Sequence, residues 1–151
     1  MTAGAVETPY AGLATRTLAF AVDAAVINAT AVVVGAVIAL CVSVLHLPSD
    51  IRHALVAIGG AAYVVWCVAY FVVFWSTAEQ TPGDRVMRVR VLATRAGDGA
   101  LKPRQALLRF VALVLAAIPL LAGIWMMLWD SRRRGLHDRM AHTVVVFEPR
   151  R

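Results

Sequence analysis

Two long stretches without a charge constrain this chain more than any other feature. Residues 24–45 and 54–75 each run for 22 residues without Asp, Glu, Lys or Arg. At about 1.5 Å per residue, a helix of that length crosses a hydrocarbon core of about 30 Å. The chain is 60% apolar with a mean hydropathy of +0.72, which lies outside the usual range of soluble domains. We therefore predict a membrane protein of one domain, residues 1–151, that contains a hairpin of two transmembrane helices.

The first hydrophobic segment carries an acid. Asp23 follows Arg16 by seven residues, close to two helical turns, so both side chains lie on one face about 10 Å apart along the axis. That separation is too long for an easy ion pair. An ionised carboxylate facing lipid is costly, so we expect Asp23 to be buried with another partner, or to handle an ion, a proton or a ligand. Asn28 and Thr30 continue the polar residues of this helix.

The expected architecture is an all-α membrane protein with a small cytoplasmic β-sheet. The hydrophobic segments cover about residues 18–45, 54–76 and 107–129, with a basic loop at 77–106 and a basic tail at 130–151. The third segment contains Pro119, so it either forms a third span or breaks into a re-entrant hairpin. We favour the hairpin, because it keeps both basic regions and both termini on the cytoplasmic side.

Two short segments have the pattern of strands. Residues 86–92 alternate apolar and cationic side chains, and residues 143–147 are a run of β-branched and aromatic residues. A lone strand leaves its backbone unpaired, so we expect the two to pair beside the membrane, with residues near Leu101 completing the sheet. Between them and the second span, Thr81-Pro82-Gly83 is expected to end helical structure.

The densest polar stretch covers residues 130–142. Its three arginines predict contact with lipid headgroups or another anion, or else a solvated stop signal: Arg132, Arg133 and Arg134. Gly135 can break the helix that precedes it. Asp138 follows the arginine run and should be salt-bridged, to Arg85, Arg88 or Arg109. Arg109, at the start of the third segment, can alternatively snorkel to the headgroups or turn towards Asp23.

Charge and composition narrow the classes of partner. The net charge of +6 is gathered in loops beside hydrophobic segments, with six basic residues between Arg85 and Arg104 and six between Arg132 and Arg151. This placement predicts anionic lipid headgroups as the partner and argues against nucleic acid. Neither the two cysteines nor the four histidines have the spacing of a metal site, and the chain lacks the common nucleotide, hydrolase and redox motifs. We expect no metal, no cofactor and no enzymatic activity.

These residues together resemble the RDD family of small membrane proteins, named for one arginine and two aspartates. Arg16 and Asp23 match the arginine and aspartate of its first helix, and Asp138 in RRGLHD matches its second aspartate. The segment from Thr81 and the closing AHTVVV run at residues 141–146 also match. Asp84 stands where a basic residue is common, and His142 where glycine is common, which puts a tight turn at that position in question.

The resemblance gives a general expectation of function. It suggests a bacterial cell-membrane protein that transports an unidentified ligand or exchanges a cation for a proton through Asp23. The alternative is a non-catalytic accessory or scaffold subunit of a larger envelope complex, such as one that transports lipid. Two spans and a hairpin are too small to enclose a transport path, so either hypothesis requires a homo-oligomer or a larger membrane complex. In the first, Arg16, Arg109 and Asp138 form a cytoplasmic gate. In the second, these three residues and Asp23 are structural latches.

Overall fold

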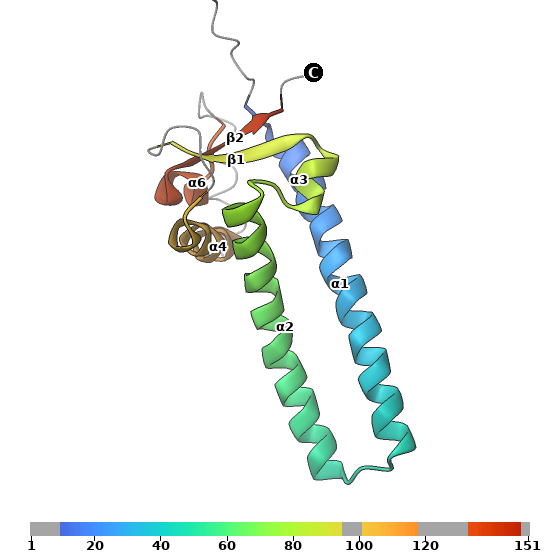
Figure 1. Ribbon diagram of the computed structural model, residues 1–151. Coiled ribbons are helices and arrows are strands. Elements are labelled where there is room, and N and C mark those ends of the chain that lie inside the picture. Colours follow the sequence, from blue (N-terminus) through green and yellow to red (C-terminus); the bar gives the residue numbers. More distant parts are fainter. Residues whose placement is uncertain (1–9, 95–100, 118–132, 149–151) are drawn as a thin grey trace, which may run out of the picture.

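The fold is a long helical hairpin with a small cap at one end (Figure 1). The computed structural model describes residues 10–94, 101–117 and 133–148. Helices α1 (Leu13–Val44) and α2 (Ser49–Thr77) form the hairpin. The other described elements form the cap, around the open end of the hairpin: α3 (Pro82–Val86), β1 (Val89–Ala93), α4 (Pro103–Ala117), α6 (Leu136–Ala141) and β2 (Thr143–Phe147).

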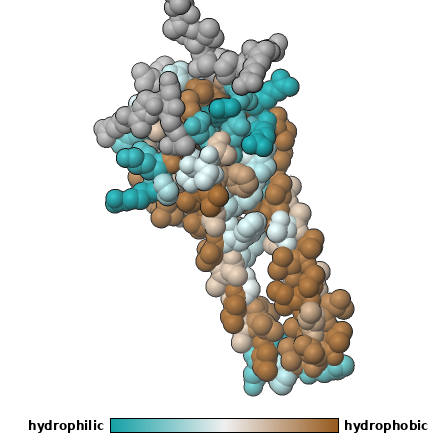
Figure 2. Space-filling model, in the orientation of Figure 1, coloured by the Kyte–Doolittle hydropathy of each residue, from teal (hydrophilic) through white to brown (hydrophobic). Residues whose placement is uncertain are grey.

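Both hairpin helices are long and apolar enough to cross a membrane, as predicted. Of the most apolar 18-residue window in each, 6% is buried in α1 and 11% in α2. A core helix of a soluble protein would be mostly buried, whereas these present apolar side chains along most of their length, flanked by polar residues at the two ends (Figure 2). α1 begins before the predicted residue 18 and ends at Val44, and α2 extends past the predicted 54–76 at both ends, because residues beside the apolar stretches also adopt helix.

The predicted pairing of two strands is confirmed. β1 and β2 are antiparallel, with Val89 opposite Phe147 and Ala93 opposite Thr143. Alternate residues of β1, Val89, Val91 and Ala93, are buried, while Arg90 stays partly exposed. A single bridge from Tyr10 to Val146 ties the segment before α1 to the same sheet. The cap therefore joins three parts of the chain that are far apart in sequence.

The first strand begins later than predicted, at Val89 instead of residue 86. The reason is that Thr81-Pro82-Gly83 starts a helix and does not merely end one. The Thr81 hydroxyl accepts from the Asp84 N–H at 3.0 Å, and the Asp84 carboxylate accepts from the Thr81 N–H at 3.2 Å. This reciprocal capping box carries α3 to Val86. The suggestion that Leu101 joins the sheet is wrong, because Leu101 is buried but not in a strand.

The third hydrophobic segment is described only at its beginning. α4 covers residues 103–117 and runs across the open end of the hairpin instead of along it (Figure 1). Phe110 of α4 packs on Phe71 of α2, with ring centroids 5.6 Å apart. Pro119 and the rest of the segment lie outside the described residues, so the choice between a third span and a re-entrant hairpin stays a prediction.

The buried core lies in the cap and in the adjoining third of the hairpin. Aromatic side chains of α2 fill it, and valines of the sheet and alanines of α4 close it: the buried members include Tyr70, Phe71, Trp75, Val89, Val91, Ala106 and Val145. Away from the cap the two helices separate, and the side chains facing the gap are exposed. Among the described residues, most of the burial that holds the hairpin together is therefore at the cap end, with the hydrogen bond from Tyr63 to Asn28 farther along the two helices.

Candidate functional site: two buried carboxylates

The first candidate site is centred on Asp138, in the short helix α6. Gly135 precedes this helix, and its N–H donates to Asp138 Oδ2 at 3.0 Å, which fixes the carboxylate over the helix start. The side chain is fully buried. It lies between two arginines that are also buried, Arg16 of α1 and Arg109 of α4, and forms an ion pair with each. The predicted salt bridge to Arg109 is confirmed, and the pair with Arg16 is an addition to it.

Both arginines have further partners that hold them in place. Arg16 donates through Nε to the Ala11 carbonyl at 3.2 Å and through Nη2 to the Arg133 carbonyl at 3.0 Å. Arg109 donates to the Thr143 hydroxyl, and its guanidinium carbon lies 4.9 Å from the ring centroid of Trp75. The cluster therefore connects α1, α2, α4, α6 and β2 through one carboxylate.

The charge state of Asp138 follows from its neighbours. Burial alone would raise the pKa of this carboxyl, but the cations of Arg109 and Arg16 outweigh burial and hold the pKa well below its usual range. Asp138 is therefore ionised at any physiological pH. Two cations and one anion leave the Arg16–Asp138–Arg109 cluster with one excess positive charge.

The second candidate site is centred on Asp23, two turns along α1 from Arg16 and also buried. Its Oδ1 accepts from the Tyr70 hydroxyl at 2.9 Å and from the Gly83 N–H at 2.7 Å, and its Oδ2 accepts from the Thr81 hydroxyl at 2.6 Å. All three donors are neutral. Across the described part of the chain no cation pairs with this carboxylate, in contrast to Asp138.

The contact between α3 and α1 explains the glycine at position 83. A Cβ atom there would collide with the Ala19 carbonyl oxygen and would come within 2.8 Å of the Asp23 carboxyl carbon. A residue without a side chain lets the start of α3 lie directly against α1. Asp84, the next residue, is part of the α3 capping box; burial raises the pKa of its carboxyl, and the Thr81 N–H opposes that rise.

Several predicted site residues are not part of either cluster. Asn28 and Thr30 are exposed on α1 in this single chain, so their grouping with the buried polar residues is wrong. Thr30 lies seven residues beyond Asp23 on the same face of α1, but farther along the helix than the contact of α3 with Ala19 and Asp23, while Asn28 lies on another side of the helix. Asn28 accepts from Tyr63 at 3.2 Å, and the Thr30 hydroxyl donates to the Val26 carbonyl. The alternative in which Arg109 turns towards Asp23 is also wrong, because Asp138 takes its guanidinium.

The predicted anion contacts have mixed outcomes. Arg132 lies outside the described residues. Arg133 is exposed, and its contribution to the site is its carbonyl, which accepts from Arg16. Arg134 lines a polar hollow of about 420 Å³ next to Asp138, together with Arg139 and His142. Contact of these side chains with headgroups or another anion stays a prediction.

Sequence reasoning missed the burial of His137. The ring is 1% exposed, and among the described residues neither nitrogen has a hydrogen-bond partner; Nε2 lies 3.6 Å from Asp138 Oδ1. Burial lowers the pKa of His137 to about 4, although Asp138 opposes that shift. The imidazole is therefore neutral at pH 7. The signal available in the sequence was that His137 directly precedes Asp138, the second aspartate of the family pattern.

The tight turn in question at His142 does form. His142 ends α6 with φ 53° and ψ 52°, in the left-handed region that favours glycine, and its N–H donates to the Arg139 carbonyl. Within the residues that the structure describes, no group of three or more His, Cys, Asp or Glu could hold a metal ion. Chemically, both carboxylates accept hydrogen bonds from other segments of the chain, from charged donors at Asp138 and from neutral donors at Asp23.

Comparisons with known proteins agree with the sequence resemblance. The model of the RDD family matches residues 10–142, which include Arg16, Asp23, Arg109 and Asp138. The uncharacterized protein RP437 of Rickettsia prowazekii (strain Madrid E) is 29% identical over 86 residues, covering 57% of this chain and 47% of the relative. The chain thus spans about half the length of the curated relative it matches. No solved structure matches it significantly.

Proposed function

Because the chain belongs to the RDD family of small membrane proteins, we propose that it is a non-catalytic accessory or scaffold subunit of a larger membrane complex. The observation that carries this proposal is the saturation of both buried carboxylates by donors from other segments of the same chain. Asp138 binds α1 and α4 to α6, and Asp23 binds α2 and α3 to α1. Carboxylates bonded in this way hold segments of the chain together, whereas a transport site needs a carboxylate that is free to bind and release its ligand.

The exposed faces of the hairpin support the second half of this proposal. Apolar side chains of α1 and α2 are mostly uncovered, including Val32, Val37, Leu40, Val56 and Val65. Small residues such as Gly35 and Gly60 have open space around them, which allows another helix to approach closely. The cap fixes the α1–α2 hairpin at one end, so the exposed faces of these helices can dock against a larger membrane protein.

The orientation is part of the proposal. The two basic regions of the sequence hold six Arg or Lys residues each. Those that the structure describes lie in the cap, among them Arg85, Arg90, Arg104 and Arg139, whereas Arg52 lies at the other end of the hairpin, in the first turn of α2. By the positive-inside rule, the cap and the basic loop face the cytoplasm, and the turn at residues 45–48 faces outward. Anionic headgroups then lie next to the arginine and lysine side chains of the cap.

Isolation from native membranes tests the accessory function. The tagged chain, extracted in a mild detergent, should be recovered at fixed stoichiometry with a larger membrane complex that mass spectrometry identifies. The exposed Cys41 of α1 offers a second, independent readout. A photo-crosslinker attached to it should capture the partner, and Cys41→Ser is the matched control. Recovery of the chain alone, or only as a homo-oligomer, contradicts the proposal.

A second candidate function rests on Asp23. A buried acid on a transmembrane helix, bound by neutral donors that include a tyrosine hydroxyl, has the chemistry of a site for proton or cation exchange. In this hypothesis a homo-oligomer completes the pathway. Proton-coupled flux in liposomes should then be lost in Asp23→Asn and kept in Asp50→Asn, an exposed acid in the first turn of α2. Unchanged flux in Asp23→Asn excludes this function.

A further inference from the structure

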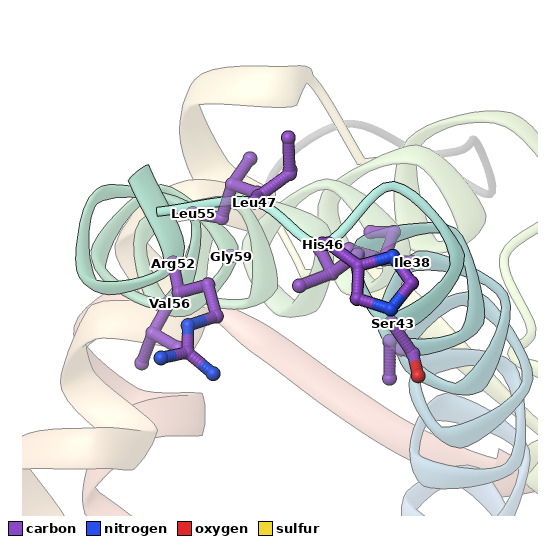
Figure 3. Close-up of a pocket in the computed structure, with 11 residues that line it drawn as sticks. Ile38, Ser43, His46, Leu47, Arg52, Leu55, Val56 and Gly59 are labelled. Atoms are coloured by element: carbon purple, nitrogen blue, oxygen red, sulfur yellow. The ribbon is translucent and has the colours of Figure 1, made fainter. Parts of the chain in front are cut away.

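An apolar crevice of about 700 Å³ separates α1 and α2 at the end of the hairpin away from the cap (Figure 3). On each helix the lining residues recur at spacings of three and four, so one stripe of α1 faces one stripe of α2. The stripes are Gly35, Ile38, Ala39 and Val42 on α1, and Arg52, Leu55, Val56 and Gly59 on α2. Gly35 and Gly59 have nothing within 4 Å of a built Cβ, which keeps the crevice open.

A membrane environment explains why the facing residues of α1 and α2 do not pack against each other at this end of the hairpin. Near the cap, aromatic contacts such as Phe20 on Phe71, with centroids 6.0 Å apart, hold the helices together. Farther out, the facing side chains are aliphatic or absent; Val42 and Leu55 are half-buried, and Val56 remains 75% exposed. In a bilayer the apolar side chains gain nothing by leaving lipid for each other, so hydrocarbon chains can fill the space.

One cation stands at the mouth of the crevice. Arg52 lies in the first turn of α2 and is exposed, and its guanidinium lies beside Val56 at the edge of the opening, across from His46 and Ser43 (Figure 3). Over the described residues no carboxylate pairs with it; the neighbouring Asp50 accepts from Ser49 at 3.3 Å. His46 Nδ1 donates to the Val44 carbonyl at 2.9 Å, whereas the Arg52 guanidinium has five donors and is always charged. Arg52 is therefore the group at this mouth that can bind an anion.

We propose that this crevice is a binding site for an anionic phospholipid, with an acyl chain between the α1 and α2 stripes and the phosphate on Arg52. Apolar walls of this size and depth suit a hydrocarbon chain. A planar guanidinium matches a phosphate with two parallel hydrogen bonds, and its stem extends along the apolar wall while the head reaches the interface. The inference goes beyond the accessory function and can be tested apart from it. Of the exposed residues named above for docking, Gly35 and Val56 also line the crevice, whereas Val32, Val37, Leu40, Gly60 and Val65 do not.

An apolar helix from a second copy or from another protein fits this opening less well. Such a helix would cover Arg52 without neutralising it, and an unpaired cation taken from water is costly. An anionic lipid supplies the apolar chain and the negative charge in one molecule. The two occupants differ in what they require at position 52, which makes them distinguishable by substitution.

The test counts lipids on the purified full-length chain by native mass spectrometry. The protein is delipidated and incubated with detergent micelles doped with equal amounts of phosphatidylglycerol and phosphatidylcholine. We expect about one tightly bound phosphatidylglycerol per chain. Arg52→Gln should lower the preference for phosphatidylglycerol about fivefold, the effect of one basic residue at an anionic lipid surface, and should leave phosphatidylcholine binding unchanged.

Two neighbouring glycines provide a matched pair of variants. Gly59→Leu fills the crevice and should reduce binding of both lipids, whereas Gly60→Leu adds the same side chain to open space outside the lining and should bind as the wild type does. Ala39→Leu, from the opposite wall, should repeat the effect of Gly59→Leu. Equal binding of the two lipids by the wild type, or equal behaviour of Gly59→Leu and Gly60→Leu, overturns the proposal. So does disulfide trapping of a helix from another chain at position 39.

Discussion

The two buried aspartates of this protein are stabilised in different ways. Asp138 lies between two arginines and is ionised because of them, while Asp23 accepts from a tyrosine, a threonine and a backbone N–H that carry no charge. The first belongs to the cap, and the second belongs to a helix that crosses the membrane. A cation beside Asp23 would itself have to be buried, whereas hydroxyl groups satisfy the carboxylate at a smaller desolvation cost. The comparison teaches that one chain uses ionic bonding where its segments meet in the cap and neutral donors farther along α1.

Asp138→Asn should have the largest effect on stability. The substitution leaves Arg16 and Arg109 buried side by side without an anion between them, so we expect a loss of about 3–5 kcal/mol in the free energy of unfolding. Denaturant titration of the purified protein in detergent measures it. Asp50→Asn, an exposed acid, is the control and should change stability by less than about 0.5 kcal/mol. A loss as small as that of the control would mean that the ion pairs do not hold the cap.

The second largest effect should be a pH dependence of stability that comes from His137. Its folded-state pKa of about 4 lies below the usual 6.5, so below pH 6.5 the unfolded chain takes up a proton that the folded chain does not. Stability should therefore fall by about 1.4 kcal/mol per pH unit, about 3 kcal/mol in all, as the pH falls from 6.5 to 4. His137→Gln should flatten this slope, and the exposed His53→Gln should not. A slope that persists in His137→Gln assigns it to other groups.

Asp23→Asn should cost less than Asp138→Asn, about 1–3 kcal/mol, because it leaves weakened hydrogen bonds and no unpaired buried cation. The same denaturant titration makes the comparison direct. Equal losses in the two variants would break the distinction drawn above, since they would indicate a cation at Asp23 contributed from outside the described residues.

A surface ion pair gives the smallest expected effect. Arg90 pairs with Glu148 on the outer face of the sheet, where the side chains are 43% and 37% exposed. Water screens such a pair, so Arg90→Gln should lower the free energy of unfolding by less than about 1 kcal/mol. A larger loss, measured by the same titration at low and high salt, would show that ionic bonding in this protein does not depend on burial.

Sequence patterns were sufficient for the elements but not for most of the contacts. Charge-free length predicted α1 and α2, and strand periodicity with the need for backbone pairing predicted β1 against β2. Charge matching predicted Arg85, Arg88 or Arg109 as the partner of Asp138, and the structure selects Arg109. The Asp138–Arg16 pair was not predicted, because the spacing of Arg16 suggested comparison with Asp23 on the same helix, and the fold that brings residues 16 and 138 together depends on the cap. Tyr70 was missed as a donor to Asp23 because an aromatic residue near the end of an apolar run is typical of a membrane interface. Thr81 and Gly83 were missed because their segment was interpreted as a helix terminator.

The capping box of α3 was also not predicted from the sequence. Proline and glycine after threonine were interpreted as a terminator, although Thr81 followed three residues later by Asp84 has the pattern of a reciprocal cap. The exposure of Asn28 and Thr30 could not be predicted from their spacing to Asp23 alone. Which face of α1 is covered depends on where α3 and α2 approach it, and that in turn depends on Gly83, whose contact with Ala19 is a tertiary feature.

The ion pair between Arg16 and Asp138 joins residues 122 positions apart. A ribosome makes Arg16 early and Asp138 near the end, at about 5–20 residues per second, so the arginine waits several seconds for its partner. During that interval the hairpin can enter the membrane while the cap stays open. The bond thus reports on synthesis: chains that stop before residue 138 cannot close the cap and would present two unpaired arginines to quality-control proteases.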